Sequence, residues 1–162
     1  MEFLNWLGGS PLAHWVSENM LVYYSLLAGH AIGMGAVVGF VYMLSARVLG
    51  FGLDIPLTVF DRLYHLTWAA FGLNFATGVL LFSANPRNLV ENPPFVLKLT
   101  FIALGGVALW ALSRSLQAEP VAVSAGGTMA SARSRAWALA AVLVWTAAIV
   151  SGRIIAYTVK YI

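Results

Sequence analysis

Four residues that can carry charge or bind a ligand stand within or beside long apolar stretches of this sequence: His30, His65, Lys98 and Arg153. His30 occupies the middle of LLAGHAIGMGAVVGF, residues 26–40, which contains no formally charged residue. An ionisable group at that depth in lipid is costly, so it usually faces a bundle interior and marks a functional position. We predict that His30 ligates the iron of a haem b or donates a hydrogen bond to a quinone. The alternative is a neutral histidine that links helices.

Lys98 and Arg153 are expected at one level, near the outer ends of their helices, where outer means the side that holds both chain termini. A planar guanidinium suits a haem propionate, a lipid phosphate or a carboxylate of a partner. An arginine near a helix end also reaches the membrane interface by default. With His30 below them, these two cations predict a cofactor site in the outer half.

His65 is a further candidate cofactor ligand, near the inner end of the second apolar run. Neighbouring spans are antiparallel, so helix rise places His30 and His65 roughly 12–15 Å apart in depth. A bis-histidine haem needs both imidazoles at nearly one level. His65 therefore serves a separate site or, as the favoured interpretation, a structural role. Asn74 is expected near the depth of His30, which makes a buried hydrogen bond between them a structural alternative.

The composition is that of an integral membrane protein. Of the 162 residues, 60% are hydrophobic and 9% are charged, whereas soluble domains carry about 25% charged residues. The net charge of +3 comes from basic residues beside the apolar runs, which is typical of membrane topology and not of nucleic-acid binding. The absence of cysteine excludes disulfides and thiolate metal sites. We expect one membrane domain over residues 1–162.

Hydropathy indicates four spans, each long enough to cross about 30 Å of hydrocarbon. They are expected at residues 20–49, 56–84, 95–113 and 136–159. Backbone polar groups inside lipid must be satisfied within the segment, so each span should be an α-helix. Pro56, and Pro93 with Pro94, suit the first turns of the second and third helices, where a missing N–H costs nothing. The predicted fold is an all-α, integral membrane four-helix bundle.

Two segments outside the spans have patterns of their own. Residues 2–18 are expected to form a short interfacial amphipathic helix on the outer membrane surface, with Ser10 as a cap and Pro11 at the first helical position. Its apolar face is expected to contain Leu12, Trp15 and Val16. The third loop, QAEPVAVSAGGTMASARSR, is rich in small residues and is expected to be a flexible connector.

The distribution of lysine and arginine between the two sides predicts the orientation of the chain in the membrane, because cytoplasmic loops carry an excess of these residues. Five arginines stand in or beside the first and third loops: Arg47, Arg62, Arg114, Arg133 and Arg135. Four basic residues stand on the other side: Arg87, Lys98, Arg153 and Lys160. We therefore expect a multi-pass protein of the bacterial inner membrane with both termini in the periplasm.

Four glycines of the first span form small-xxx-small patterns, which permit close helix approach: Gly29, Gly33, Gly35 and Gly39. At about 100° per residue, only Gly33 lies beside His30. Helix packing therefore explains most of this stripe better than room for a flat cofactor does. The same helix is the expected contact surface for a homo- or hetero-oligomer.

Several longer segments carry a resemblance to known proteins. They are GHAIGMG followed by R-x-x-G at 47–50, WAAFGLNFATGVLLFSA at 68–84, NPPFVLK at 92–98 and GRIIAY at 152–157. Together they resemble, over most of the chain, a family of small four-helix bacterial membrane proteins defined by a domain of unknown function. The chain also resembles, more distantly, CopD-type copper-resistance proteins and the helices of b-type cytochromes. The resemblance implies an inner-membrane four-helix protein with His30, Lys98 and Arg153 at family-typical positions.

Two functions compete on this basis. The first is a small inner-membrane redox subunit that binds haem b or a quinone in its outer half and exchanges electrons with membrane or periplasmic redox subunits. The second is a cofactor-free accessory or anchor subunit of a larger membrane complex, which the short loops and glycine-rich faces favour. A transporter or copper-handling protein ranks third. The six acids form no pair spaced for acid–base catalysis, so a complete enzyme is not expected.

Overall fold

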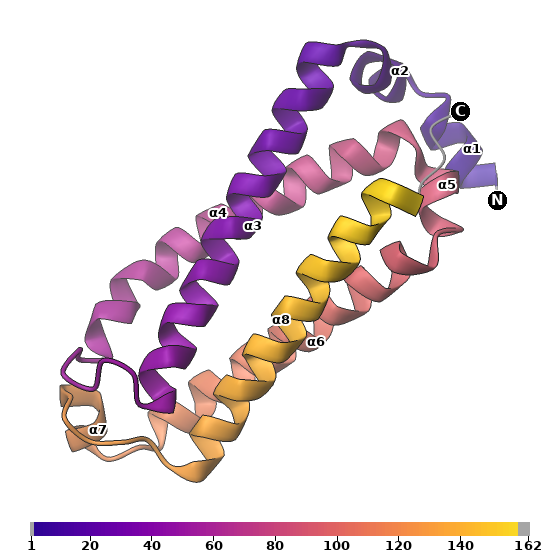
Figure 1. Ribbon diagram of the computed structural model, residues 1–162. Coiled ribbons are helices and arrows are strands. Elements are labelled where there is room, and N and C mark those ends of the chain that lie inside the picture. The colour runs from indigo at the N-terminus through magenta and orange to yellow at the C-terminus, as the bar shows by residue number, and fades with distance from the viewer. Residues whose placement is uncertain (1, 159–162) are drawn as a thin grey trace.

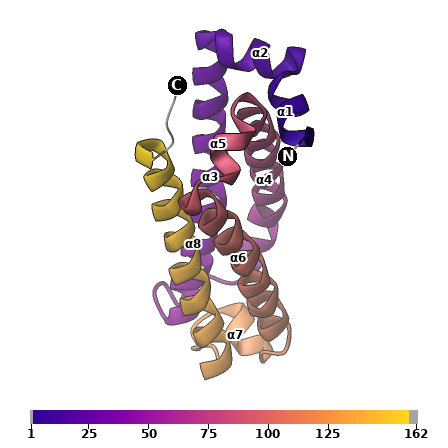
Figure 2. The same cartoon turned by 90° about the vertical axis from the view of Figure 1, so that its right-hand side faces the viewer.

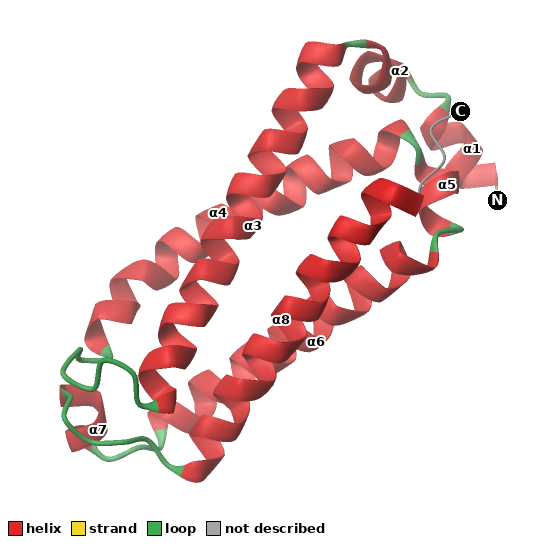
Figure 3. Cartoon of the chain, in the orientation of Figure 1, coloured by secondary structure: helices red, strands yellow, loops and turns green. Residues whose placement is uncertain are grey.

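The computed structural model describes residues 2–158 and is all-helical, with no strand among these residues (Figure 3). The helices (Figure 1) are α1 (Glu2–Gly8), α2 (Pro11–Glu18), α3 (Met20–Leu49), α4 (Thr58–Ala84), α5 (Pro86–Val90), α6 (Pro93–Gln117), α7 (Val121–Ala125) and α8 (Ala132–Thr158). Helices α3, α4, α6 and α8 are long and apolar enough to cross a membrane. The all-α prediction is confirmed, and the four apolar helices indicate a multi-pass membrane protein. Residue 159 of the predicted fourth span and the basic residue Lys160 lie outside the described residues.

The four predicted spans correspond to these four helices, with differences at their ends. The predicted first span has the bounds of α3. The second begins at Thr58 and not at Pro56, which lies in the turn before the helix. Pro93 and Pro94 stand in the first turn of α6, as predicted, and that helix continues to Gln117. This helix is therefore longer than the span that hydropathy alone indicated.

The N-terminal segment forms two short helices where the sequence predicted one interfacial helix. Ser10 caps α2, because its side chain accepts the backbone N–H of Ala13 at 3.2 Å, and Pro11 occupies the first turn as predicted. Helix α2 packs against α4 and buries Ala13 and Val16. Trp15 remains 54% exposed. The expected apolar face is thus divided between a protein contact and an outward surface.

The four long helices pack as two pairs (Figures 1 and 2). Helix α3 lies against α4, α6 lies against α8, and α3 also contacts α8. In contrast, α4 and α6 do not pack closely along their backbones. Helices α1, α2 and α5 and the last turn of α8 lie at one end of the molecule, and α7 lies at the other. We call these the outer end and the inner end, after the predicted topology.

The apolar core lies in the inner half of the molecule. Its buried members include Val41 of α3, Leu112 of α6 and Ala141 of α8. Trp145 of α8 packs so tightly on Gly105 of α6 that a Cβ at Gly105 would come within 2.7 Å of the indole nitrogen. All buried members of this cluster come from the inner halves or midpoints of the long helices, or from α7 and the loop before α8. The outer half is held together by other contacts.

Arg47 joins the inner loops to the core. It is 1% exposed and lies in the last turn of α3. Its guanidinium donates to the carbonyl oxygen of Ile55, between α3 and α4, and to that of Val123 in α7, the latter at 3.0 Å. Val123 is itself buried. The third loop, expected to be a plain connector, therefore contains a helix that packs on the protein.

Glu119 and three serines form a polar cluster where α6 ends and α8 begins. A carboxylate oxygen of Glu119 accepts the Ser131 backbone N–H at 3.0 Å and the hydroxyls of Ser131 and Ser134. The Ser134 hydroxyl also lies 2.7 Å from that of Ser115. The hydrogen bonds from Ser131 and then Ser134 stabilise the carboxylate and hold the pKa of Glu119 below its usual range.

We expect the Glu119 cluster to make stability depend on acid pH. The pKa of Glu119 is lower in the folded protein than in the unfolded chain. The carboxylate therefore stabilises the folded protein fully when the pH is above the ordinary glutamate pKa, and this stabilisation is lost as the pH falls through the pKa of Glu119 in the folded protein. Glu119→Gln keeps the shape and removes the charge, so it should flatten this part of the pH–stability curve. Thermal unfolding in detergent from neutral to acid pH measures the effect. An identical acid limb in the variant would contradict the assignment.

A methyl group at Gly33 should separate α3 from α4. The new Cβ would lie 2.8 Å from the Ala70 carbonyl oxygen and 2.9 Å from the Asn74 backbone nitrogen, and no side-chain rotation relieves these contacts. We expect Gly33→Ala to lower the free energy of unfolding by about 1–3 kcal/mol. Gly35→Ala is the matched control, because a Cβ there meets nothing within 4 Å. Equal unfolding midpoints for the two variants in detergent would contradict this packing.

Candidate functional site

His30 of α3 and Asn74 of α4 exchange hydrogen bonds between side chain and backbone. His30 Nδ1 lies 2.9 Å from the Asn74 carbonyl oxygen, and Asn74 Nδ2 donates to the His30 carbonyl oxygen at 2.7 Å. Contact between these residues was one structural interpretation of the sequence, and it is present. Gly33, one turn after His30, permits the close helix approach that both bonds need.

The partner of Nδ1 determines the tautomer of the neutral His30 ring. A carbonyl oxygen can only accept a hydrogen bond, so Nδ1 carries the proton and donates it to Asn74. The Thr77 hydroxyl oxygen is also near Nδ1, at 3.2 Å, and Thr77 donates its own proton to the Leu73 carbonyl oxygen at 2.7 Å. Nε2 is thereby left with a lone pair.

Lys98 of α6 reaches that lone pair with its amino group. Lys98 Nζ lies 3.3 Å from His30 Nε2, so the lysine nitrogen donates and the ring nitrogen accepts. The lysine stem passes Gly152 of α8, where a Cβ would lie 3.4 Å from Lys98 Cδ. Across the described part of the chain, no carboxylate forms an ion pair with Lys98. The site therefore holds a basic amine beside an imidazole, without an acid to balance it.

All four long helices contribute to this one level of the molecule. We call the set the site layer, and its members are His30, Asn74, Thr77, Gly78, Lys98 and Gly152. A Cβ at Gly78 would lie 3.0 Å from Cε1 of the histidine ring. Sequence reasoning missed Thr77, Gly78 and Gly152. Thr77 and Gly78 follow Asn74 by three and four residues, a spacing that indicates a shared helix face, whereas Gly152 gave no signal of its own.

Arg153 does not join the site layer. Its side chain is exposed, and its guanidinium carbon lies over the Tyr157 ring, 5.4 Å from the centroid. The residue that approaches Lys98 from α8 is Gly152, the neighbour of Arg153. In this position Arg153 suits a contact with the membrane interface, and the predicted group of His30, Lys98 and Arg153 is reduced to its first two members.

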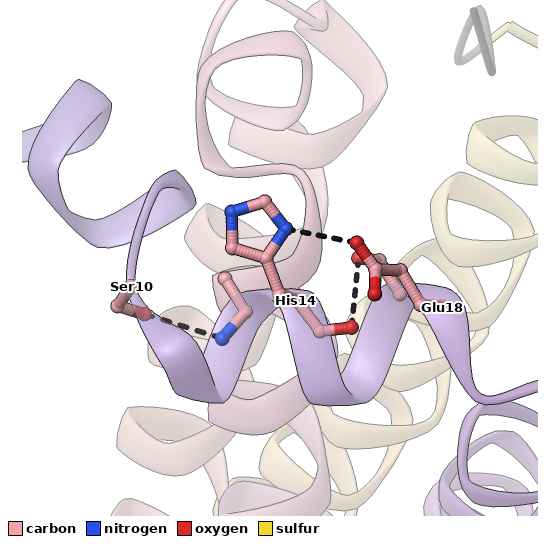
Figure 4. Close-up of polar contacts among 5 residues, drawn as sticks. Ser10, His14 and Glu18 are labelled. Carbon is pink, nitrogen blue, oxygen red and sulfur yellow. Dashed lines mark hydrogen bonds and ion pairs between the residues drawn. The ribbon is translucent and has the colours of Figure 1, made fainter.

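The other two histidines lie apart from the site layer. His65 is exposed on α4 and precedes Asn74 by nine residues, roughly 13 Å along the helix. Because Asn74 contacts His30, the two histidines lie at different levels along the helices. His14 Nδ1 lies 3.1 Å from a carboxylate oxygen of Glu18 in an exposed contact on α2 (Figure 4). In the part of the chain that the structure describes, no group of three or more His, Cys, Asp or Glu side chains is arranged for a metal ion.

Two phenylalanines border the site layer on its outer side. Phe82 of α4 and Phe95 of α6 stack with ring centroids 5.7 Å apart and an interplanar angle of 12°. Phe82 follows Gly78 by four residues, and Phe95 precedes Lys98 by three. Along its helix, each of these residues therefore lies one turn, roughly 5 Å, from the site layer towards the outer end.

The surroundings of His30 fit a hydrogen-bonding ligand better than an iron atom. Haem iron binds imidazole through the lone pair of a ring nitrogen. Nδ1 is committed to Asn74, and Lys98 Nζ stands 3.3 Å in front of Nε2, so the residues as arranged do not fit a haem. A carbonyl oxygen needs no such displacement, because it accepts directly from a lysine amino group.

Comparisons with known proteins do not identify the chain. No family model, no curated protein and no solved structure matches it. The resemblance suggested by the short motifs therefore stays an expectation, and proposals about function rest on the geometry of the site layer.

We expect the neutral His30 ring to be protonated at Nδ1 and unprotonated at Nε2. Nitrogen NMR of histidine-labelled protein in detergent distinguishes the two states of each ring nitrogen. His14→Gln and His65→Gln remove the other histidine signals and leave His30 assigned. Lys98→Met should shift the Nε2 resonance and leave Nδ1 nearly unchanged. A protonated Nε2 in the neutral ring would contradict the hydrogen-bond assignment.

Proposed function

We propose that this protein is a small redox subunit of the bacterial inner membrane that binds a quinone in its outer half. The observation that carries the proposal is the 3.3 Å contact between Lys98 Nζ and His30 Nε2, formed within apolar helices and with no acid partner among residues 2–158. Ionisable groups in such a place are costly and are usually functional. A planar molecule with carbonyl oxygens would meet there an amine donor and an imidazole that can take up a proton.

The two side chains have different roles in this proposal. Lys98 donates to a carbonyl oxygen of the quinone, and its charge favours the negative charge that develops there during reduction. His30 exchanges a proton at Nε2, while its Nδ1–H bond to Asn74 orients the ring. The electrons pass to or from a periplasmic redox protein, and the protons to or from water. The chain is then one subunit of an electron-transfer system and not a complete enzyme.

The distribution of charge supports a periplasmic outer end. The arginines near the inner end are Arg47, Arg62, Arg114, Arg133 and Arg135, and basic residues are in excess on the cytoplasmic side of bacterial membrane proteins. Phe3, Trp6 and Trp15 at the outer end are each more than half exposed, at 65%, 68% and 54%. Aromatic side chains in this position suit the boundary between lipid and water.

Haem b, the other predicted cofactor, is the weaker proposal for this site. The Lys98 amino group occupies the position in front of Nε2 from which an iron would bind the His30 lone pair. Arg153, expected to bind a propionate, lies outside the site layer. His65, the further candidate ligand, is exposed on α4 far from His30. A haem would therefore require Lys98 to leave its present position.

One surface favours a second function, that of a cofactor-free accessory subunit. Gly29 and Gly33 pack against α4, but a Cβ at Gly35 or Gly39 would meet nothing within 4 Å. Small residues on an open helix face permit close approach of another membrane helix. In this second function the site layer would only link the helices, and the partner would be a homo- or hetero-oligomeric membrane subunit.

Binding of a short-chain quinone to the purified protein in detergent separates the two functions. We expect Lys98→Met to weaken binding about tenfold or more, the effect of losing a hydrogen bond from a charged group. We expect His30→Ala to weaken binding as well, because the Lys98 amino group loses the acceptor that positions it. His65→Ala, an exposed site on α4, is the matched control and should bind normally. A dithionite-reduced minus oxidised absorption spectrum is recorded on the same samples, and we expect no haem bands.

The outcomes are distinct. Soret and α bands that disappear in His30→Ala would establish a b-type haem and overturn the quinone proposal. A protein that shows no such bands and binds no quinone would overturn both redox proposals and favour the accessory subunit. Binding that is equally strong in wild type and Lys98→Met would exclude the site layer as the quinone site.

A further inference from the structure

Two side-chain contacts connect α6 to the α3–α4 pair in the outer half. One is the polar contact between Lys98 and His30, and the other is the stack of Phe82 on Phe95. The backbones of α4 and α6 do not pack closely. Side chains and not backbone therefore determine how far these two helices stand apart at this level.

Beyond this stack, towards the outer end, a separate contact joins the start of α6 to the end of α8. Asn92, just before α6, is 6% exposed and donates from Nδ2 to the Thr158 hydroxyl of α8 at 3.0 Å. The short helix α5 connects α4 to this point. Below the site layer, the apolar core fills the inner half. A lipid-soluble ligand of the site layer is thus expected to arrive from the side between α4 and α6, the two neighbouring helices whose backbones do not pack closely.

We infer that Phe82 and Phe95 form the stacking wall for the flat head group of a lipid-soluble quinone, and that this head group enters between α4 and α6. The inference rests on the proposed function. The rings lie one turn outward from Lys98, are nearly parallel at 12° and are only half-buried. Aromatic rings favour offset stacking on another flat ring. The head group lies against the rings while Lys98 donates a hydrogen bond to its oxygen.

This arrangement assigns specificity to the two phenylalanines. Lys98 can donate to any accessible carbonyl oxygen, whereas the ring pair selects a flat ligand. A linear ketone of similar polarity gains the hydrogen bond and lacks the stacking. The discrimination between a planar and a non-planar ligand should therefore reside in Phe82 and Phe95 and not in the site layer.

The test compares quinone binding by the full-length protein and its variants in lipid nanodiscs, with a short-chain benzoquinone as the probe. We expect Phe95→Leu and Phe82→Leu each to weaken binding about two- to tenfold, because leucine keeps the apolar contact but lacks a flat ring. Phe75→Leu is the matched control, since Phe75 lies on α4 at 64% exposure and takes no part in the Phe82–Phe95 stack. Thermal unfolding of each variant establishes that the fold is retained.

Each result decides the inference. Weaker binding in both variants, with normal binding in Phe75→Leu, supports the stacking wall. Unchanged or tighter binding in Phe95→Leu and Phe82→Leu, together with loss of binding in Lys98→Met, would overturn the stacking wall and leave the proposed function intact. If wild-type protein does not bind the quinone, the proposed function itself fails and the inference fails with it.

Discussion

The outer half of this molecule depends on the hydrogen bonds of one imidazole. Among apolar helices a polar group cannot turn to water, so each ring nitrogen of His30 needs a partner within the protein. Asn74 supplies that partner from α4, and Lys98 supplies the other from α6. Gly33 and Gly152 leave the space that these partners occupy. The needs of a single side chain thus bring residues from all four long helices to one depth.

Different forces hold the two halves of the molecule. The inner half has a conventional apolar core, in which Trp145 packs on Gly105, and its loops are tied down by Arg47. The outer half has few buried apolar side chains, and α6 meets the α3–α4 pair there through side chains. A change in the outer half therefore costs few core contacts, which is what a ligand-binding region on a rigid base requires.

Short sequence patterns such as caps and prolines predicted the helices well, but they did not predict how the loops pack on the rest of the protein. The cap at Ser10 and the proline start of α6 follow from backbone chemistry within a few residues, and both are present. The start of α4 was predicted two residues too early, at Pro56 and not at Thr58, because a proline suits the turn before a helix as well as the first helical turn. The loop around Val123 was expected to lack structure, since its anchor, Arg47, comes from a distant part of the sequence.

The sequence by itself determined that four apolar helices form and at which level along its helix each polar residue lies, because hydropathy and the rise of about 1.5 Å per residue are local properties. It therefore placed His30 and Asn74 at one level and His65 at another. Only the tertiary structure decided which cation meets His30. Neighbouring residues on a helix point about 100° apart, so packing that turns Gly152 towards Lys98 turns Arg153 outward. That rotation of α8 about its axis is determined by its contacts with other helices, which the sequence does not reveal.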